Sequence, residues 1–187
     1  MNILDIVGAA IGLVFVFSEY KASRWLWPSS LLMAAFYAVI DFRIGWYANM
    51  SICLYNFGIS IYGLLVWRGL LQSREKKERL IASCPARLWP WLIAVTAALT
   101  LFFYWLLPLL GESNMPLLDG LSASLGIVGM WMLSQKYWEQ WFFWLVSEPI
   151  LAYIYFSTGY TASAVMYVIY EVFVIMGIIR WKKESIS

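Results

Sequence analysis

The sequence predicts an all-α integral membrane protein with seven transmembrane helices, arranged as two parallel three-helix repeats joined by a linker helix. Three observations lead to this fold class. Of the 187 residues, 63% are hydrophobic and only 13% are charged, whereas soluble domains are nearer half apolar and a quarter charged. The apolar residues form seven continuous segments. Finally, a shift of 114 residues without a gap matches the start of the chain to its end.

Each segment approaches the ~20 residues that a helix needs to cross ~30 Å of hydrocarbon. Helices are expected because the segments are continuously apolar and too long for barrel strands. The chain starts without a basic region, so the first segment is expected to be a span rather than a cleaved signal peptide. The seven expected spans are residues 3–20, 25–43, 45–67, 88–108, 117–134, 138–156 and 160–181.

The first three spans form one expected unit, residues 1–68, and the last three form a second, residues 116–183. Between them lies region 69–115, a basic loop followed by the fourth span, and a tail of residues 184–187 ends the chain. Because three helices cross the membrane an odd number of times, the fourth span lets the second unit start on the same side as the first. The units are then parallel, with a solute path between them. A duplication kept only for packing is the alternative.

Positive charge sets the expected orientation of these spans. The segment 68–87 contains six of the thirteen Lys and Arg residues and is expected to be cytoplasmic. With seven spans, twelve of the thirteen fall on that side and only Arg43 does not. We therefore expect the N-terminus outside and the C-terminus inside.

The repeat rests on residue types that seldom match by chance in apolar helices, namely Gly, Trp and Asp. Leu and Val match readily by chance in apolar helices, so their matches are no evidence for a repeat. The matched pairs are Asp5 with Asp119, Gly12 with Gly126, Trp27 with Trp141, Phe42 with Phe156, Gly45 with Gly159, Gly63 with Gly177, and Trp67 with Trp181.

Two glutamates, Glu148 and Glu171, lie near the middle of expected spans, with no Lys or Arg at their depth. A charge at that depth costs about 3 kcal/mol or more, so it normally faces a partner or a watery cavity. The shift pairs Glu148 with Ala34 and Glu171 with Phe57, so neither acid belongs to a symmetric pair. We expect Glu148 to be the counter-charge of a cationic solute, and Glu171 to be a second wall or a gating residue. A proton relay is the alternative.

Polar and aromatic side chains accompany these acids at helical spacing. An aromatic ring over a desolvated cation contributes roughly 0.5–2 kcal/mol. A small polar residue such as Ser60 serves equally well to bond a neighbouring helix. The expected substrate-binding residues are Glu148, Trp141, Trp144, Asn56, Asn49, Tyr55, Tyr167, Tyr170, Glu171 and Ser60.

The other conspicuous residues have simpler expected roles. Glu139 lies in a short connection beside Lys136, where an exposed surface position is expected. Tryptophans close to the span ends are expected to anchor the protein at the membrane interface. These are Trp25, Trp27, Trp46, Trp67, Trp89, Trp138 and Trp181.

The composition also excludes several functional classes. The chain has no histidine, and its two cysteines fall in a span (Cys53) and a loop (Cys84), so an enzyme and a cofactor are not expected. The net charge of +2 and the absence of an RNA-binding motif argue against nucleic acid. The expected partners are the bilayer and a small solute, while a homo-oligomer and a scaffold role stay open.

Several motifs resemble the Pnu family of vitamin transporters, the PnuC-like proteins, and the resemblance covers essentially the whole chain. It implies seven helices in a SWEET-like arrangement in the bacterial inner membrane. It also implies facilitated diffusion of vitamins such as nicotinamide riboside or thiamine, with trapping by cytoplasmic phosphorylation. The motifs are Trp25-Leu26-Trp27-Pro28, Tyr47-Ala48-Asn49, Ser60-Ile61-Tyr62-Gly63, Trp67, Lys136-Tyr137-Trp138-Glu139-Gln140-Trp141, Trp144, Gly177 and Trp181.

Within this family the chain is most similar to the thiamine branch, PnuT. The run Gly129-Met130-Trp131-Met132-Leu133 and the acid Glu148 resemble that branch. Nicotinamide riboside members carry Gln in place of Cys53, and Asn in place of Ser60 and Glu148. Asn49 departs from the thiamine pattern, which has an acid there. Thiamine, a flat ring cation, is therefore the expected substrate, and nicotinamide riboside is the alternative.

Overall fold

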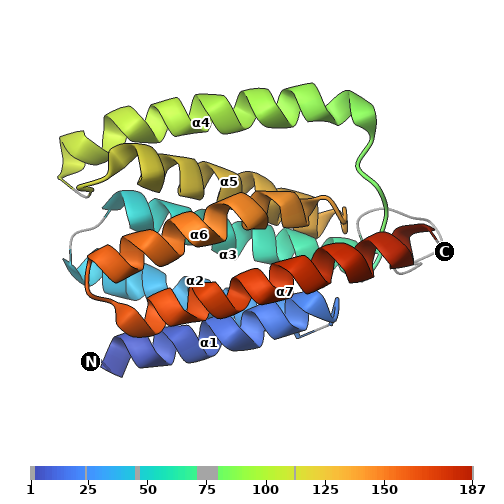
Figure 1. The fold of residues 1–187 in the computed structure, drawn as a ribbon, viewed down its shortest axis with the longest axis horizontal. Coiled ribbons are helices and arrows are strands. Elements are labelled where there is room, and N and C mark those ends of the chain that lie inside the picture. Colours follow the sequence, from blue (N-terminus) through green and yellow to red (C-terminus); the bar gives the residue numbers. More distant parts are fainter. Residues whose placement is uncertain (1–2, 24, 45–46, 71–79, 112, 187) are drawn as a thin grey trace.

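In the computed structural model, the described residues form seven α-helices that lie side by side in one bundle (Figure 1). The structure describes residues 3–23, 25–44, 47–70, 80–111 and 113–186. A short 3₁₀ helix, η1, covers Ala86–Leu88. The α-helices are α1 (Ile3–Tyr20), α2 (Leu26–Ile44), α3 (Tyr47–Trp67), α4 (Trp89–Leu110), α5 (Pro116–Ser134), α6 (Gln140–Ser157) and α7 (Thr161–Ile186).

The seven expected spans correspond to these helices to within two residues, except at the end of α7. That helix continues past residue 181, where Arg180 and Glu184 form an ion pair one turn apart at 2.7 Å. Within the described residues, four helices are long and apolar enough to cross a membrane by length and composition. These apolar stretches are Met50–Trp67, Ala86–Leu110, Pro116–Ser134 and Thr161–Ser185.

Six helices form a closed ring, and α4 packs outside it, mainly against α5. Around the ring, α1 contacts α2, α2 contacts α3, α3 contacts α5, α5 contacts α6, α6 contacts α7, and α7 contacts α1. We call α1–α3 the first half of the chain and α5–α7 the second half. Two of these contacts, α3 with α5 and α1 with α7, join the first half to the second. Figure 1 shows α1 beside α7, although the two helices are at opposite ends of the sequence.

The first connection of each half has the same backbone conformation. Ala22 and Lys136, which are 114 residues apart, both adopt the left-handed region, with φ of 48° and 52°. Their N–H groups donate to the carbonyl oxygens of Glu19 and Leu133, both at 2.9 Å. Few residues other than glycine adopt a positive φ, so the shared turn is a specific likeness between the halves.

Each half also places a tryptophan ring directly on a glycine of the neighbouring helix. The Trp27 ring of α2 lies on Gly63 of α3, where an added Cβ would be 2.2 Å from the ring. The Trp141 ring of α6 lies on Gly177 of α7, where it would be 2.4 Å from the ring. Only glycine leaves room for this approach.

Trp67 and Trp181 complete what we call the four-tryptophan cluster, together with Trp27 and Trp141. Trp67 meets Trp27 edge to face at 5.3 Å, and Trp181 meets Trp141 in the same way at 5.7 Å. Trp67 and Trp181 also lie 6.5 Å apart across the two halves. Interfacial anchoring was therefore the wrong expectation for Trp27, Trp67 and Trp181, which are all buried. Gly63 lets the Trp27 ring pack inside the bundle, and Trp67 and Trp181 are buried against the other rings of the cluster, whereas Trp25 is 73% exposed.

Two hydrogen bonds from this cluster cross between the halves. Trp67 Nε1 donates to the Leu133 carbonyl at the end of α5, at 3.3 Å. Trp181 Nε1 donates to the Tyr20 carbonyl at the end of α1, at 3.1 Å. Each bond joins the third helix of one half to the first helix of the other, so the cluster ties the two halves together.

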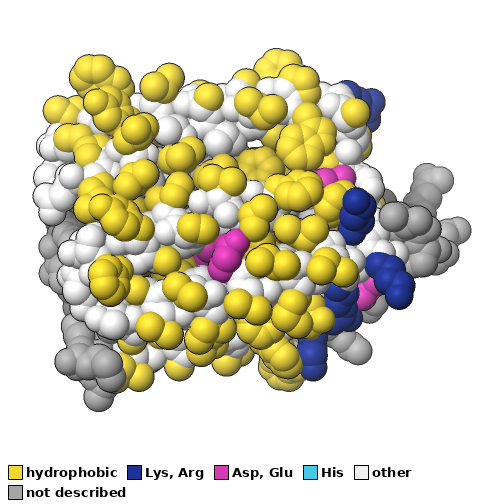
Figure 2. Space-filling view, viewed as in Figure 1, with side chains coloured by type: hydrophobic (Ala, Val, Ile, Leu, Met, Phe, Trp, Pro, Cys, Tyr) yellow, Lys and Arg dark blue, Asp and Glu magenta, His cyan; other side chains and the backbone are white. Residues whose placement is uncertain are grey.

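The cluster lies at what we call the basic end of the bundle, where α1, α3, α5 and α7 end. Figure 2 shows the Lys and Arg side chains gathered at this end, beside a broad hydrophobic surface. Lys136 Nζ lies 4.4 Å from the centre of the Trp67 ring, and the Arg180 guanidinium lies 5.0 Å from the Tyr20 ring. The basic end therefore combines surface cations with buried aromatic rings.

Residues 80–85 are fastened to the α5–α6 connection at the same end. The Ala82 N–H donates to the Lys136 carbonyl at 3.0 Å, and the Trp138 N–H donates to the Ala82 carbonyl at 3.1 Å. The Cys84 N–H donates to Glu139 Oε2 at 2.8 Å. The expected exposed position of Glu139 was therefore wrong: its side chain is buried because it accepts a backbone N–H of the loop.

Replacing either cluster glycine by alanine should destabilise the protein, because the new methyl group would overlap a tryptophan ring. We expect Gly63→Ala and Gly177→Ala each to cost about 1–3 kcal/mol, the range for overpacked cores. Thermal unfolding of the purified protein in detergent measures this. Gly58→Ala on α3 is the matched control, since nothing lies within 4 Å of its added Cβ. Equal melting temperatures for all three variants would contradict the packing described.

The Cys84 thiol should react unusually slowly at neutral pH. Burial raises its pKa to about 11, and the nearby Glu139 carboxylate contributes to the shift. Because the thiolate is the reactive form, alkylation by iodoacetamide should keep accelerating up to about pH 11. In a Cys53→Ala background, Glu139→Gln should accelerate the reaction at pH 8, because it removes the negative charge but keeps an acceptor for the Cys84 N–H. An unchanged rate would show that the carboxylate does not influence the thiol.

Candidate functional site

Three carboxylates lie close together between α1, α6 and α7, and they define the candidate site. Glu19 of α1 is 0% exposed, Glu148 of α6 is 1% exposed, and Glu171 of α7 is half-buried. In the described part of the chain, the charged neighbours of Glu148 are the other two acids. Buried carboxylates without a basic partner are costly in a membrane protein and mark a functional site by default.

Side chains from the three helices surround the Glu19 carboxyl group. The Tyr170 hydroxyl of α7 donates a hydrogen bond to Glu19 Oε2. Gln140 and Trp144 of α6 lie against the same carboxyl group. Trp144 Nε1 donates to Gln140 Oε1, and the Trp144 ring packs against the Tyr170 ring at 6.3 Å. An acid, an amide and two aromatic rings therefore form one buried cluster.

Several polar atoms of this cluster have no hydrogen-bond partner. They are Glu19 Oε1, Glu148 Oε2, Glu171 Oε2 and Gln140 Nε2, all buried. A buried polar group without a partner costs roughly 1–3 kcal/mol, so a ligand that supplies the missing bonds would recover this free energy. The vacant positions among these side chains are three carboxylate acceptors and one amide donor. They suit a solute that carries positive charge and offers both a donor and an acceptor.

The local sequence explains how α6 presents Glu148 and Trp144. The residue after Glu148 is Pro149, which lacks an N–H and leaves a helix carbonyl without its usual partner. One turn earlier, the Trp144 ring lies on Gly129 of α5, where an added Cβ would be 3.2 Å from it. Trp144 is thus held between the α5 backbone and the Tyr170 ring.

The structure brings together four of the expected site residues: Glu148, Trp144, Tyr170 and Glu171. Others have different contacts. Trp141 belongs to the four-tryptophan cluster. Tyr167 stacks on Tyr155 with ring centres 5.2 Å apart.

The expected site residues of α3 make contacts outside the acid cluster. The Tyr55 hydroxyl donates to the Ile127 carbonyl of α5 at 2.8 Å. The Ser60 and Ser30 hydroxyls are 2.6 Å apart in a buried contact between α3 and α2. Asn56 is half-buried, and Asn49 lies outside the residues whose side chains the structure describes. Tyr55 and Ser60 therefore hold helices together in this structure.

Sequence reasoning missed Glu19 and Gln140, because both lie close to the ends of expected spans, where polar side chains usually meet water. The sequence around Glu19 does contain a pattern that indicates a buried position. It follows Gly8, Gly12 and Phe15 at helical spacing, and all four are buried on one face of α1. An acid that continues a small and apolar packing face is directed into the bundle.

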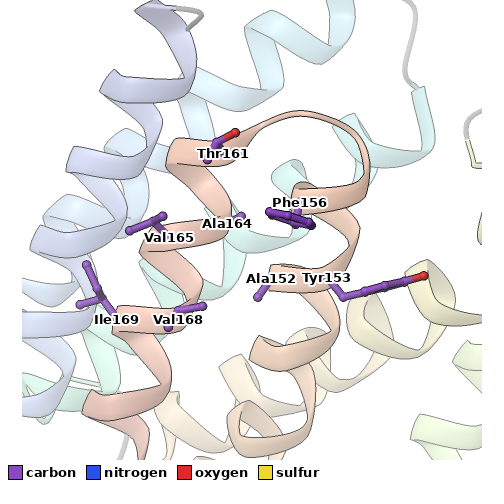
Figure 3. A pocket seen from close by; sticks show the side chains of 8 residues that line it. All are labelled: Ala152, Tyr153, Phe156, Thr161, Ala164, Val165, Val168 and Ile169. Carbon is purple, nitrogen blue, oxygen red and sulfur yellow. The ribbon is translucent and has the colours of Figure 1, made fainter.

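A shallow cleft of ≈ 380 Å³ lies elsewhere, between α6 and α7. Figure 3 shows Ala152 and Phe156 of α6 opposite Ala164 and Val168 of α7. All its lining residues are apolar except for the hydroxyls of Tyr153 and Thr161, and no carboxylate lines it. The apolar lining of this outer cleft suits lipid chains better than a charged solute.

Comparison with known proteins identifies the class of molecule. A sequence family described as nicotinamide mononucleotide transporter matches residues 2–183. The chain belongs to this family. Its helical bundle, apolar surface and buried acids are accordingly those of a multi-pass membrane transporter, as the sequence led us to expect.

Relatives within the family carry different substrates in their names. The nicotinamide riboside transporter PnuC of Neisseria mucosa is 28% identical over 91% of this chain and 67% of its own length. The riboflavin/roseoflavin transporter RibM of Streptomyces davaonensis is 27% identical over 97% of this chain and 85% of its own length. The crystal structure of the vitamin B3 transporter PnuC has a TM-score of 0.74 and 25% identity, covering 96% of this chain and 80% of that one. The chain is thus a vitamin transporter of the PnuC family, whereas the thiamine branch expected from the sequence stays a prediction.

The Tyr170 hydroxyl should contribute to stability through its bond to Glu19. Tyr170→Phe leaves a second oxygen of a buried carboxyl group without a donor, and we expect a loss of about 1.5–3 kcal/mol, typical of hydrogen bonds to charged groups. Thermal unfolding in detergent measures it. Tyr153→Phe serves as the control because the Tyr153 side chain is 56% exposed. A Tyr170→Phe protein as stable as the control would contradict the proposed bond.

Proposed function

We propose that the protein carries nicotinamide riboside across the bacterial inner membrane by facilitated diffusion, with cytoplasmic phosphorylation trapping the vitamin. The observation that carries this proposal is the buried acid cluster, which has aromatic rings beside it and no basic partner among the described residues. Relatives named as nicotinamide riboside transporters add weight to this choice of vitamin.

The chemistry of nicotinamide riboside matches the groups of the site. Its pyridinium ring is flat and positively charged, so Glu148 can serve as counter-charge while the aromatic rings of Trp144 and Tyr170 lie beside it. Its carboxamide has both a donor and an acceptor. Gln140 Nε2 and Glu19 Oε1, which lack partners, can bond these two groups. Asn56 is the amide that we assign to the opposite wall.

Transport would proceed by alternating access between two parallel three-helix units, residues 1–68 and 116–183, with α4 as the linker. The ring of six helices, the shared turn at Ala22 and Lys136, and the paired Trp–Gly contacts support this division. The basic end would face the cytoplasm, because Lys and Arg prefer that side. In this conformation the four-tryptophan cluster would close the cytoplasmic end, and opening would break its two crossed hydrogen bonds.

Thiamine is the second candidate, and one specific observation favours it. Glu148 and Glu19 put two carboxylates in the site. The family resemblance implies that nicotinamide riboside members carry amide side chains at the positions of Cys53 and Ser60. A thiazolium cation with a flat aminopyrimidine needs the charges more than the additional amides. Riboflavin fits less well, since its neutral ring system gains no Coulomb energy from the acids.

Competition between vitamins tests the choice of substrate. In proteoliposomes containing the purified protein, uptake of labelled nicotinamide riboside should be saturable and should be reduced by unlabelled vitamin. Excess thiamine should compete as a ring cation, and riboflavin should not. Uptake of thiamine without uptake of nicotinamide riboside would replace the first candidate by the second. The absence of saturable uptake of any of the three would overturn a transport role for this site.

Removing the charge of Glu148 should weaken vitamin binding. Glu148→Gln preserves shape but loses the counter-charge, and we expect a loss of about 1.5–3 kcal/mol, roughly ten- to hundredfold in Kd. Calorimetry on the purified variant measures it. Glu184→Gln at the basic end is the matched control, because Glu184 pairs with Arg180 on the surface. An unchanged Kd for Glu148→Gln would remove Glu148 from the site.

A further inference from the structure

Two vacant polar atoms of the candidate site are of opposite kinds. Glu19 Oε1 is an acceptor and Gln140 Nε2 is a donor, and both side chains are 0% exposed. Gln140 lies against the Glu19 carboxyl group, yet these two atoms do not bond to each other. A buried pair left open in this way is complementary to a solute edge that offers one donor and one acceptor side by side.

Hydrogen bonds from aromatic residues fix which atom of each group stays open. The Tyr170 hydroxyl donates to Glu19 Oε2, so Oε1 is the open oxygen. Trp144 Nε1 donates to Gln140 Oε1. Because an indole N–H can only donate, it selects the carbonyl oxygen of the amide and leaves Nε2 open. The Trp144 ring is itself held between the Tyr170 ring and Gly129 of α5, so the amide orientation is set by packing.

The site already contains three carboxyl groups, those of Glu19, Glu148 and Glu171. Glu148 is 1% exposed and Glu171 is half-buried, and one oxygen of each has no hydrogen-bond partner. Among the described residues, the charged neighbours of Glu148 are the other two acids. A solute with a carboxylate of its own would therefore add acceptors and negative charge where neither is matched. An amide group adds no charge and brings a donor.

We propose that Glu19 and Gln140 together recognise the amide edge of the ring cation and exclude its carboxylic acid analogue, with Trp144 as a positioning residue. The inference rests on the proposed function, because it needs a ring cation beside Glu148. Glu19 Oε1 accepts a hydrogen bond from the amino group of the solute, and Gln140 Nε2 donates one to the neighbouring acceptor.

Both candidate vitamins have an edge of this kind. In nicotinamide riboside it is the carboxamide, with its amino group as donor and its carbonyl oxygen as acceptor. In thiamine the amino group of the pyrimidine is the donor and the adjacent ring nitrogen is the acceptor. The pair therefore selects a class of solute, a flat ring cation that carries a donor next to an acceptor.

Wild-type protein tests this edge with matched analogues and needs no variant. Calorimetry should show that nicotinamide riboside binds at least about a hundredfold more tightly than nicotinic acid riboside, in which a carboxylate replaces the carboxamide. If thiamine is the vitamin bound, oxythiamine should be rejected likewise, because its oxo group and ring N–H reverse the donor and the acceptor. Equal affinities for the vitamin and its analogue would overturn the inference and leave the proposed function standing. Failure of nicotinamide riboside, thiamine and riboflavin alike to bind would overturn both.

Two variants attribute the discrimination to the residues named. Glu19→Gln keeps the shape but adds a donor, so the ratio of the two affinities should narrow at least about tenfold. Trp144→Phe keeps a ring beside Tyr170 but frees the Gln140 amide to rotate, and it should narrow the same ratio. Glu184→Gln is the control and should keep the wild-type ratio. A merely structural role would weaken both ligands alike, so an unchanged ratio in Glu19→Gln would overturn the assignment of Glu19, and one in Trp144→Phe that of Trp144.

Discussion

The rest of this bundle depends on one kind of contact, in which a tryptophan ring packs directly against the backbone of a neighbouring helix at a glycine. Gly63 and Gly177 leave no side chain between the ring and the helix, so Trp27 and Trp141 bring the second and third helices of each half together. Trp67 and Trp181 then meet between the halves and donate to carbonyls at the ends of α5 and α1. The same contacts thus fix each half internally and hold the two halves in register at the basic end.

The alignment of the two halves determines where the acids lie. Because α1 packs against α7, Glu19 from the start of the chain meets Tyr170 from its end, and Gln140, Trp144 and Glu148 of α6 complete the cluster. The acids are expensive to bury and have no basic neighbour among the described residues. A transporter of cations has a physical reason to keep them, since the solute restores the charge balance that the empty site lacks.

The sequence predicts the helices of this fold closely, because spans of lipid-exposed apolar residues are a strong signal and the 114-residue repeat is specific. It also identified Glu148, Trp144 and Tyr170 as neighbours. It missed Glu19, which lies one residue from the end of α1 and resembles an interfacial side chain until its packing face is considered. It misjudged Trp27, Trp67 and Trp181, since the position of a tryptophan along a span does not say that a glycine faces it, as for Trp27, or that another buried ring packs on it, as for Trp67 and Trp181. Glu139 was misjudged because its partner, the Cys84 N–H, comes from a distant loop.

We propose that a ring cation binds beside Trp144 and Tyr170, against the carboxyl groups of Glu148 and Glu19. An experimental structure of the protein with nicotinamide riboside bound tests it most directly. The account predicts density for a flat ring at these four side chains, inside the ring of helices. Density in the outer cleft between Ala152 of α6 and Val168 of α7, with the acid cluster unchanged, would contradict it.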